Sequence, residues 1–115
     1  MMELPKEEYI KVEKDGQIYT CCTMRQKALH TIGLNSSYPR IKKRLYTRNG
    51  KRYYKPYRNY FYGNDSDLNK LVEAGYMESY QETFNGRKEK TYWFNRTGLD
   101  WLGEQLDIYI YDEDF

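Results

Sequence analysis

The side chains that most often carry enzymatic chemistry are few in this 115-residue sequence. It contains one histidine, His30, and two adjacent cysteines, Cys21 and Cys22. A cysteine nucleophile needs a base and a group that orients the base, and no acid stands near His30 in the sequence. Adjacent cysteines seldom bridge each other, and a zinc site with one histidine would have to recruit carboxylates. We therefore expect no enzyme, no cofactor and no metal site.

A different chemistry, the binding of anions, is indicated by the distribution of charge. Residues 16–64 contain eleven Lys and Arg and no Asp or Glu, whereas residues 65–115 contain twelve acids and five bases. The net charge of +2 does not reveal this segregation. A segment without acids attracts polyanions if its basic side chains share a face after folding. The alternative is that this basic segment docks against the acidic third of its own chain.

Aromatic side chains alternate with the bases in the same segment. Bases neutralise phosphates and rings stack on nucleobases, so the combination is typical of a nucleic-acid-binding surface. Some of the rings must instead build the core, because the segment has few Leu, Ile and Val. We expect the nucleic-acid or partner contacts to come from Arg40, Lys42, Lys43, Arg44, Arg48, Lys51, Arg52, Lys55 and Arg58, with Tyr53, Tyr54 and Tyr57 packing or stacking.

Three dipeptides predict tight hairpin turns. They are Asp15-Gly16 between residues 9–13 and 17–21, Asn49-Gly50 between 45–48 and 51–54, and Asn85-Gly86 between 78–84 and 88–94. Asp-Gly and Asn-Gly tolerate the positive φ angles that two-residue hairpin turns require. The third hairpin adds bases to the acidic third of the chain, at Arg87, Lys88 and Lys90.

Capping signals predict helices between these hairpins and after the last one. In chain order, they are a helix over 24–32 capped by Thr23, a short helix opened by Ser36 or Ser37 with Pro39, a helix capped by one of residues 64–67 and stopped at Gly75, and a helix opened by Thr97. Each signal supplies a side chain that accepts hydrogen bonds from the first free backbone N–H groups. Residues 108–115 are interpreted as an edge strand or an acidic tail.

The C-terminal half has the order helix, glycine turn, hairpin, helix. The defining positions are Leu68, Leu71, Val72, Gly75, Tyr76 and Met77 before the hairpin, and Thr97, Gly98, Leu99 and Leu102 after it. This order resembles the winged helix of bacterial MarR- and PadR-type regulators. Residues 29–34, 56–61 and 71–77 also resemble small phage- and prophage-encoded proteins. The resemblance implies a winged helix-turn-helix-like fold whose hairpin wing touches the phosphate backbone or the minor groove.

The helix before the predicted wing departs from the regulator pattern. It carries Asp65, Asp67, Lys70 and Glu73, and the three negative charges repel phosphates. It also lacks a face rich in Arg, Asn or Gln that could contact base edges. The basic segment around residues 40–58 is therefore expected to make more of the contact than this helix.

These observations combine into one expectation for the whole chain. We expect a single α+β, winged-helix-like domain over residues 1–115, with an N-terminal hairpin (1–22), a core (23–106) and an acidic tail (107–115). The expected function is that of a small phage-type nucleic-acid-binding regulatory or accessory protein in the cytoplasm of a bacterial host. The alternative is an anti-defence inhibitor, such as an anti-CRISPR protein, because Tyr and Arg are favoured in protein interfaces. No apolar run is long enough for a membrane span, and the charge segregation leaves a homodimer open.

Overall fold

The computed structural model describes residues 2–34, 45–56 and 58–110. In the described residues, three helices and eight strands form a small α+β fold, as expected. Their order is β1 (Tyr9–Lys14), β2 (Gln17–Cys22), α1 (Met24–Thr31), β3 (Leu45–Arg48), β4 (Lys51–Tyr54), β5 (Phe61–Tyr62), α3 (Ser66–Glu73), β6 (Met77–Phe84), β7 (Arg87–Phe94), α4 (Arg96–Leu106) and β8 (Tyr109–Ile110). The predicted helix opened by Ser36 or Ser37 with Pro39 lies outside the described ranges.

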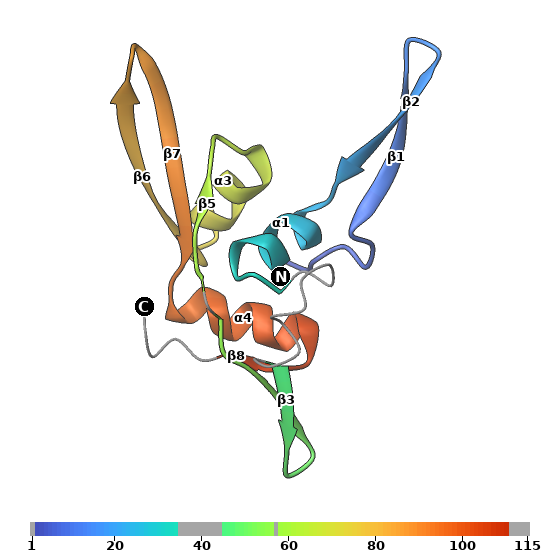
Figure 1. Ribbon diagram of the computed structural model, residues 1–115, viewed down its shortest axis with the longest axis vertical. Helices are drawn as coiled ribbons and strands as arrows, with labels where there is room; N and C mark the ends of the chain where they lie inside the picture. Colours follow the sequence, from blue (N-terminus) through green and yellow to red (C-terminus); the bar gives the residue numbers. More distant parts are fainter. Residues whose placement is uncertain (1, 35–44, 57, 111–115) are drawn as a thin grey trace.

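All three predicted hairpins are confirmed, each with the predicted turn. The first turn residues, Asp15, Asn49 and Asn85, have φ angles of 52°, 52° and 50°, and the glycine that follows each has a φ of 77°. Two successive positive φ angles define the turn type whose twist matches that of the flanking strands. Figure 1 shows the β1–β2 and β6–β7 hairpins leaving the core on one side and the β3–β4 hairpin leaving it on the other.

Helix α1 is capped by Thr23, as predicted, and α3 is capped by Asp65, one of the four residues 64–67 that the sequence offered as caps. The Thr23 hydroxyl accepts a 3.4 Å hydrogen bond from the backbone N–H of Gln26, and α1 ends before Gly33, whose φ is 74°. The Asp65 carboxylate accepts hydrogen bonds from the backbone N–H groups of Asp67 and Leu68, at 2.9 and 3.1 Å. These bonds satisfy donors that have no partner inside the helix.

The prediction that Thr97 opens the last helix is wrong. The N-cap of α4 is Asn95, whose side-chain oxygen accepts a 2.8 Å hydrogen bond from the backbone N–H of Gly98. Asn95 directly follows β7 and keeps an extended backbone, with φ −85° and ψ −179°. The helix therefore starts as soon as the strand ends, and Thr97 lies within its first turn.

Two three-stranded sheets flank the helices. One has the order β5-β7-β6 and the other the order β3-β4-β8, in which β8 is parallel to β4. The short strand β5 was not predicted. Residues 109–110 form the edge strand that was one of the two interpretations of the C-terminal segment.

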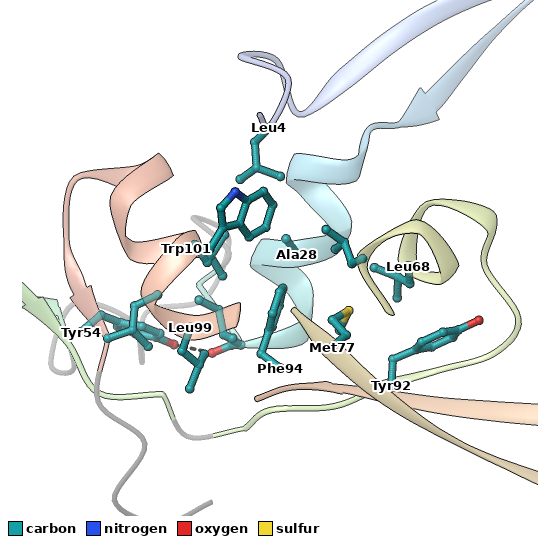
Figure 2. Close-up of a cluster of buried hydrophobic side chains, with 13 residues drawn as sticks. Leu4, Ala28, Tyr54, Leu68, Met77, Tyr92, Phe94, Leu99 and Trp101 are labelled. Carbon is teal, nitrogen blue, oxygen red and sulfur yellow. Dashed lines mark hydrogen bonds between the residues drawn. The ribbon is translucent and has the colours of Figure 1, made fainter. Parts of the chain in front are cut away.

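The core lies where the three helices meet the ends of the hairpins opposite their turns, as Figure 2 shows. It contains Leu4, Ala28, Ile32, Tyr54, Leu68, Leu71, Met77, Tyr92, Phe94, Leu99, Trp101, Leu102 and Ile110. A Cβ atom on Gly98 would lie 1.8 Å from the carbonyl oxygen of Tyr76, so the start of α4 packs directly on backbone. Among the described residues, no helix is long and apolar enough to cross a membrane.

Candidate nucleic-acid interface

The structure separates the predicted contact residues into several groups. Arg40, Lys42, Lys43, Arg44 and Tyr57 lie outside the described residues. Arg48, Lys51 and Arg52 surround the tip of the β3–β4 hairpin, and all three are exposed. Arg87 and Lys88 are exposed at the tip of the β6–β7 hairpin, at the opposite end of the molecule in Figure 1. Among the described residues, the bases at the two hairpin tips therefore do not form one continuous surface.

Three tyrosines form a ladder across the sheet β3-β4-β8. Tyr46 is directly opposite Tyr53, and Tyr53 is directly opposite Tyr109. The rings of Tyr46 and Tyr53 are stacked, with centroids 5.5 Å apart and an interplanar angle of 17°. The rings of Tyr53 and Tyr109 meet edge to face at 5.8 Å. Since the outer rings, Tyr46 and Tyr109, are 39% and 48% exposed, solvent reaches both ends of the ladder.

The opposite face of the same sheet belongs to the core. Tyr54 and Ile110 are 0% and 1% exposed, and Leu45 is partly buried against them. Side chains alternate between the faces of a strand, so burying these residues turns the neighbouring tyrosines outward. Tyr54 was predicted to pack or to stack. In this fold it packs, because no part of its side chain is available to a ligand.

Two bases share the outer face with the tyrosine ladder. Arg48 follows Tyr46 by two residues and Lys51 precedes Tyr53 by two, so all four point to the same side of the hairpin. Arg48 and Lys51 are also directly opposite each other. Within the described residues neither base forms a salt bridge. Like charges opposite each other destabilise a hairpin, and an anionic ligand would relieve that repulsion.

Arg52 lies on the other face of β4, where the charges are mixed. It lines an open pocket between the hairpin tip and α4, together with Asp100, Glu104 and Asp107. Acids and bases around one pocket partly cancel their potentials. The outer face with the tyrosine ladder is therefore the better anion site on this hairpin.

Contacts from α4 hold β8 in the sheet. The guanidinium of Arg96 donates hydrogen bonds to a carboxylate oxygen of Asp100, at 2.7 Å, and to the carbonyl oxygen of Ile110, at 2.8 Å. The same guanidinium lies 5.9 Å from the centre of the Tyr109 ring. Arg96 thus positions the last ring of the ladder.

Lys27 belongs to the same basic segment, and its side chain pairs with carboxylates of the acidic third of the chain. Its ammonium lies 2.9 Å from a carboxylate oxygen of Asp65 and 2.9 Å from one of Asp67. Burial lowers the pKa of Lys27, but hydrogen bonds and attraction to both carboxylates outweigh burial and leave the pKa raised. This pair of bonds joins α1 to the N-terminus of α3, and it removes Lys27 from any ligand surface.

Three other predicted bases make contacts within the fold. Arg58 lies 4.2 Å above the ring of Tyr60 and donates a 2.8 Å hydrogen bond to the Tyr60 carbonyl. Lys90 donates a 3.3 Å hydrogen bond to the side chain of Asn69. Lys55 is only partly exposed. These side chains are less available to a ligand than those at the hairpin tips.

The β6–β7 hairpin has bases at its tip and acids along its strands. Glu82 and Glu89 are directly opposite each other. Hydrogen bonding toward Glu89 and the negative charges of Glu89 and Glu82 raise the pKa of Tyr62, whose side chain is exposed. Of the three predicted bases on this wing, only Arg87 and Lys88 are fully exposed at the tip.

Among the described residues, Cys21, Cys22 and His30 do not cluster with acidic side chains. Cys21 is partly buried, Cys22 is exposed, and both are free thiols in β2. His30 meets Phe61 edge to face at 5.9 Å, and burial together with the charge of Arg58 lowers the pKa of His30. In the described ranges, no group of three or more His, Cys, Asp and Glu is arranged to hold a metal ion.

Sequence reasoning did not include Tyr46 and Tyr109 among the contact residues. The alternation of Tyr109 and Ile110 was a usable signal for a half-buried strand. Its partner, β4, is more than fifty positions away in the sequence. No local pattern reports such a pairing.

No family model, no curated protein and no solved structure matches this chain. The function is therefore inferred from the site alone.

Proposed function

We propose that the protein binds nucleic acid through the outer face of the β3–β4–β8 sheet. The observation that carries the proposal is the tyrosine ladder of Tyr46, Tyr53 and Tyr109 with Arg48 and Lys51 on the same face. In this proposal, unpaired nucleobases stack on the exposed outer rings, and the side chains of Arg48 and Lys51 hold the backbone phosphates.

The spacing of these side chains supports a single-stranded ligand. Neighbouring strands lie about 4.8 Å apart, and residues two positions apart on a strand are separated by about 7 Å. A base on Tyr46 therefore leaves its phosphate within reach of the long side chain of Arg48. A duplex presents few exposed base faces, so the rings would contribute little to duplex binding.

The winged-helix interpretation of the C-terminal half is a secondary part of the proposal. The sheet order β5-β7-β6 and the projecting β6–β7 hairpin support it. A single helix, α3, connects β5 to β6, and two acids at its N-terminus are paired with Lys27. Phosphate contacts from this half would come from the hairpin tip, at Arg87 and Lys88, rather than from α3.

The phage-type regulatory or accessory role remains part of the proposal, and the anti-defence inhibitor remains its rival. Both use a surface rich in Tyr and Arg, which also suits a protein partner. Binding of the purified chain to nucleic acid separates the two, since the inhibitor does not require it.

The experiment is an anisotropy titration of labelled single-stranded DNA, single-stranded RNA and duplex DNA at two salt concentrations. The test variant is Arg48→Glu/Lys51→Glu, and the matched control is Arg87→Glu/Lys88→Glu, which makes the same charge change at the other hairpin tip. We expect the test variant to lose at least about tenfold in affinity for single strands, with its salt slope reduced by roughly 1.4, about 0.7 for each lost phosphate contact. The control should lose less.

Two results would overturn the proposal. One is wild-type protein that shows no salt-sensitive binding to any of the three ligands. The other is an equal loss in both variants, which would mean that the β3–β4 face has no special role. Thermal melting of each variant, followed by circular dichroism, establishes that the charge reversals leave the protein folded.

A further inference from the structure

The β1–β2 hairpin carries an apolar surface that nothing in the described chain covers. It pairs with no other strand, and all of its strand residues except Cys21 are exposed. Ile10, Val12 and Tyr19 share one face and are 46%, 40% and 46% exposed. A two-stranded hairpin is only marginally stable alone. In Figure 1 this hairpin extends away from the core.

The register of the hairpin decides which backbone groups of β1 are open. Lys14 is opposite Gln17 across a two-residue turn, which makes that pair hydrogen-bonded in the ladder. Val12 and Ile10 therefore also bond to β2, because the pattern repeats every second residue. Lys11 and Glu13 direct their N–H and C=O groups outward, to the open edge of β1.

We propose that β1 pairs antiparallel with β1 of a second copy of this chain, with the two-fold axis at Val12. In this register Lys11 lies opposite Glu13 of the second copy, and Glu13 lies opposite its Lys11. Each of these is a hydrogen-bonded pair of opposite charge, so the backbone pattern and the side-chain charges select the same alignment. The two hairpins become one four-stranded sheet.

Other symmetric registers are less favourable. An axis at Lys11 places two lysines opposite each other, and an axis at Glu13 places two glutamates opposite each other, which is destabilising. An axis at Ile10 pairs no opposite charges. The outer edge of β2 presents Ile18, Thr20 and Cys22, and without charges nothing there fixes a register.

The proposed register also fits the length of the hairpin. With the axis at Val12, Asp15 at the turn of one copy lies level with Tyr9 of the other, the first residue of β1. The turn of one hairpin therefore ends level with the first residue of β1 in the second copy and does not reach the core of that copy. Lys14 lies opposite Ile10 of the second copy, where its methylene groups can cover the exposed isoleucine.

Disulfide trapping tests the register directly. In a Cys21→Ser/Cys22→Ser background, Val12→Cys places two thiols across the axis in a non-hydrogen-bonded pair, where the Cα atoms are about 4.5 Å apart, within disulfide range. The matched control is Ile10→Cys, whose two copies are offset by four residues, about 14 Å along the strands. We expect mild oxidation to give a covalent dimer for Val12→Cys and little or none for Ile10→Cys.

A charge exchange tests the pairing without cysteines. Lys11→Glu should weaken self-association at least about tenfold in sedimentation experiments, because four glutamates then meet at the edge. The double variant Lys11→Glu/Glu13→Lys restores both opposite pairs and should restore the dimer. Inside the hairpin these residues face Thr20 and Ile18, so neither change introduces a like-charge pair within one copy.

A wild-type chain that stays monomeric, with a dimer dissociation constant above about 1 mM, would overturn the proposal. Equal cross-linking of the Val12→Cys and Ile10→Cys variants would overturn the register. A hairpin that serves only another kind of protein leaves the purified chain monomeric, so that outcome also counts against the proposal. Because β1 and the tyrosine ladder share no residue, the two proposals can fail separately. Nucleic-acid binding can be absent while the dimer forms, and the dimer can be absent while nucleic acid binds.

Discussion

The hydroxyl of Tyr54 donates a 2.7 Å hydrogen bond to the carbonyl oxygen of Ile32, the C-cap residue of α1. Carbonyl groups at the end of a helix have no partner inside the helix, so this bond satisfies one of them. It also fixes which side of β4 faces the core. Tyr53, the next residue along the strand, must then lie on the outer face, where it becomes the middle ring of the ladder. A core contact thus determines the orientation of the candidate site.

Tyr46, one of the two outer rings of the ladder, gives the first prediction. Tyr46→Ala removes an exposed stacking surface and should cost about 1–3 kcal/mol of binding free energy for single strands, roughly 5- to 150-fold in affinity. Tyr80→Ala is the control, because Tyr80 is 58% exposed on β6, away from the ladder. Anisotropy titrations of both variants measure the difference. Equal affinities for the two variants would count against stacking on the β3–β4–β8 face.

The corrected N-cap of α4 gives a second prediction. Asn95→Ala should lower the free energy of unfolding by about 1–2 kcal/mol, because it removes the cap of Gly98. It also removes a 3.0 Å hydrogen bond that the Asn95 amide donates to the carbonyl of Gly75. Thr97→Ala, at an exposed position in the same turn, should change stability by less than about 0.5 kcal/mol. Urea denaturation measures both, and a larger loss for Thr97→Ala would contradict the assignment.

The lowered pKa of His30 gives a prediction about pH. Burial and the positive charge of Arg58 disfavour the imidazolium form in the folded state, so the unfolded chain takes up a proton more readily. The stability that neutral His30 contributes is present above the usual histidine pKa of about 6.5 and is lost as the pH falls through the lower folded value.

Melting temperatures measured from about pH 8 to about pH 5 bracket that transition. The wild-type protein should lose more stability over this range than His30→Gln, which cannot take up the proton. Arg58→Gln should fall between the two, because one of the two causes of the shift is removed. If wild-type protein and His30→Gln lose the same stability, His30 does not titrate in this way.

Much of the fold follows from local signals in the sequence. Asp15, Asn49 and Asn85, each before a glycine, place all three hairpin turns correctly, because few other residues accept two successive positive φ angles. Thr23 places the start of α1, and the capping residues 64–67 place the start of α3 to within a few positions, since their side chains can reach the free N–H groups of the first turn. These features depend on interactions among residues close in the chain.

The remainder depends on contacts between distant residues. The parallel pairing of Tyr53 with Tyr109 needs the whole core to bring β8 beside β4. The capture of Lys27 by Asp65 and Asp67 needs α1 and α3 to pack side by side. A charge count along the chain could not separate the bases that stay exposed, such as Arg48, from those used inside the fold. The candidate site was therefore found only in part.

The three glycine turns lie at the far ends of hairpins, where none of the turn glycines has a neighbouring atom within 4 Å of its missing side chain. Extra residues inserted at a tip of this kind would lengthen one arm and leave the packing at its base unchanged. The tips of the three hairpins therefore do not contribute to the packing of the core. Affinity tags or fluorophores could be grafted onto the β6–β7 tip, which lies outside both the tyrosine ladder and the proposed dimer edge.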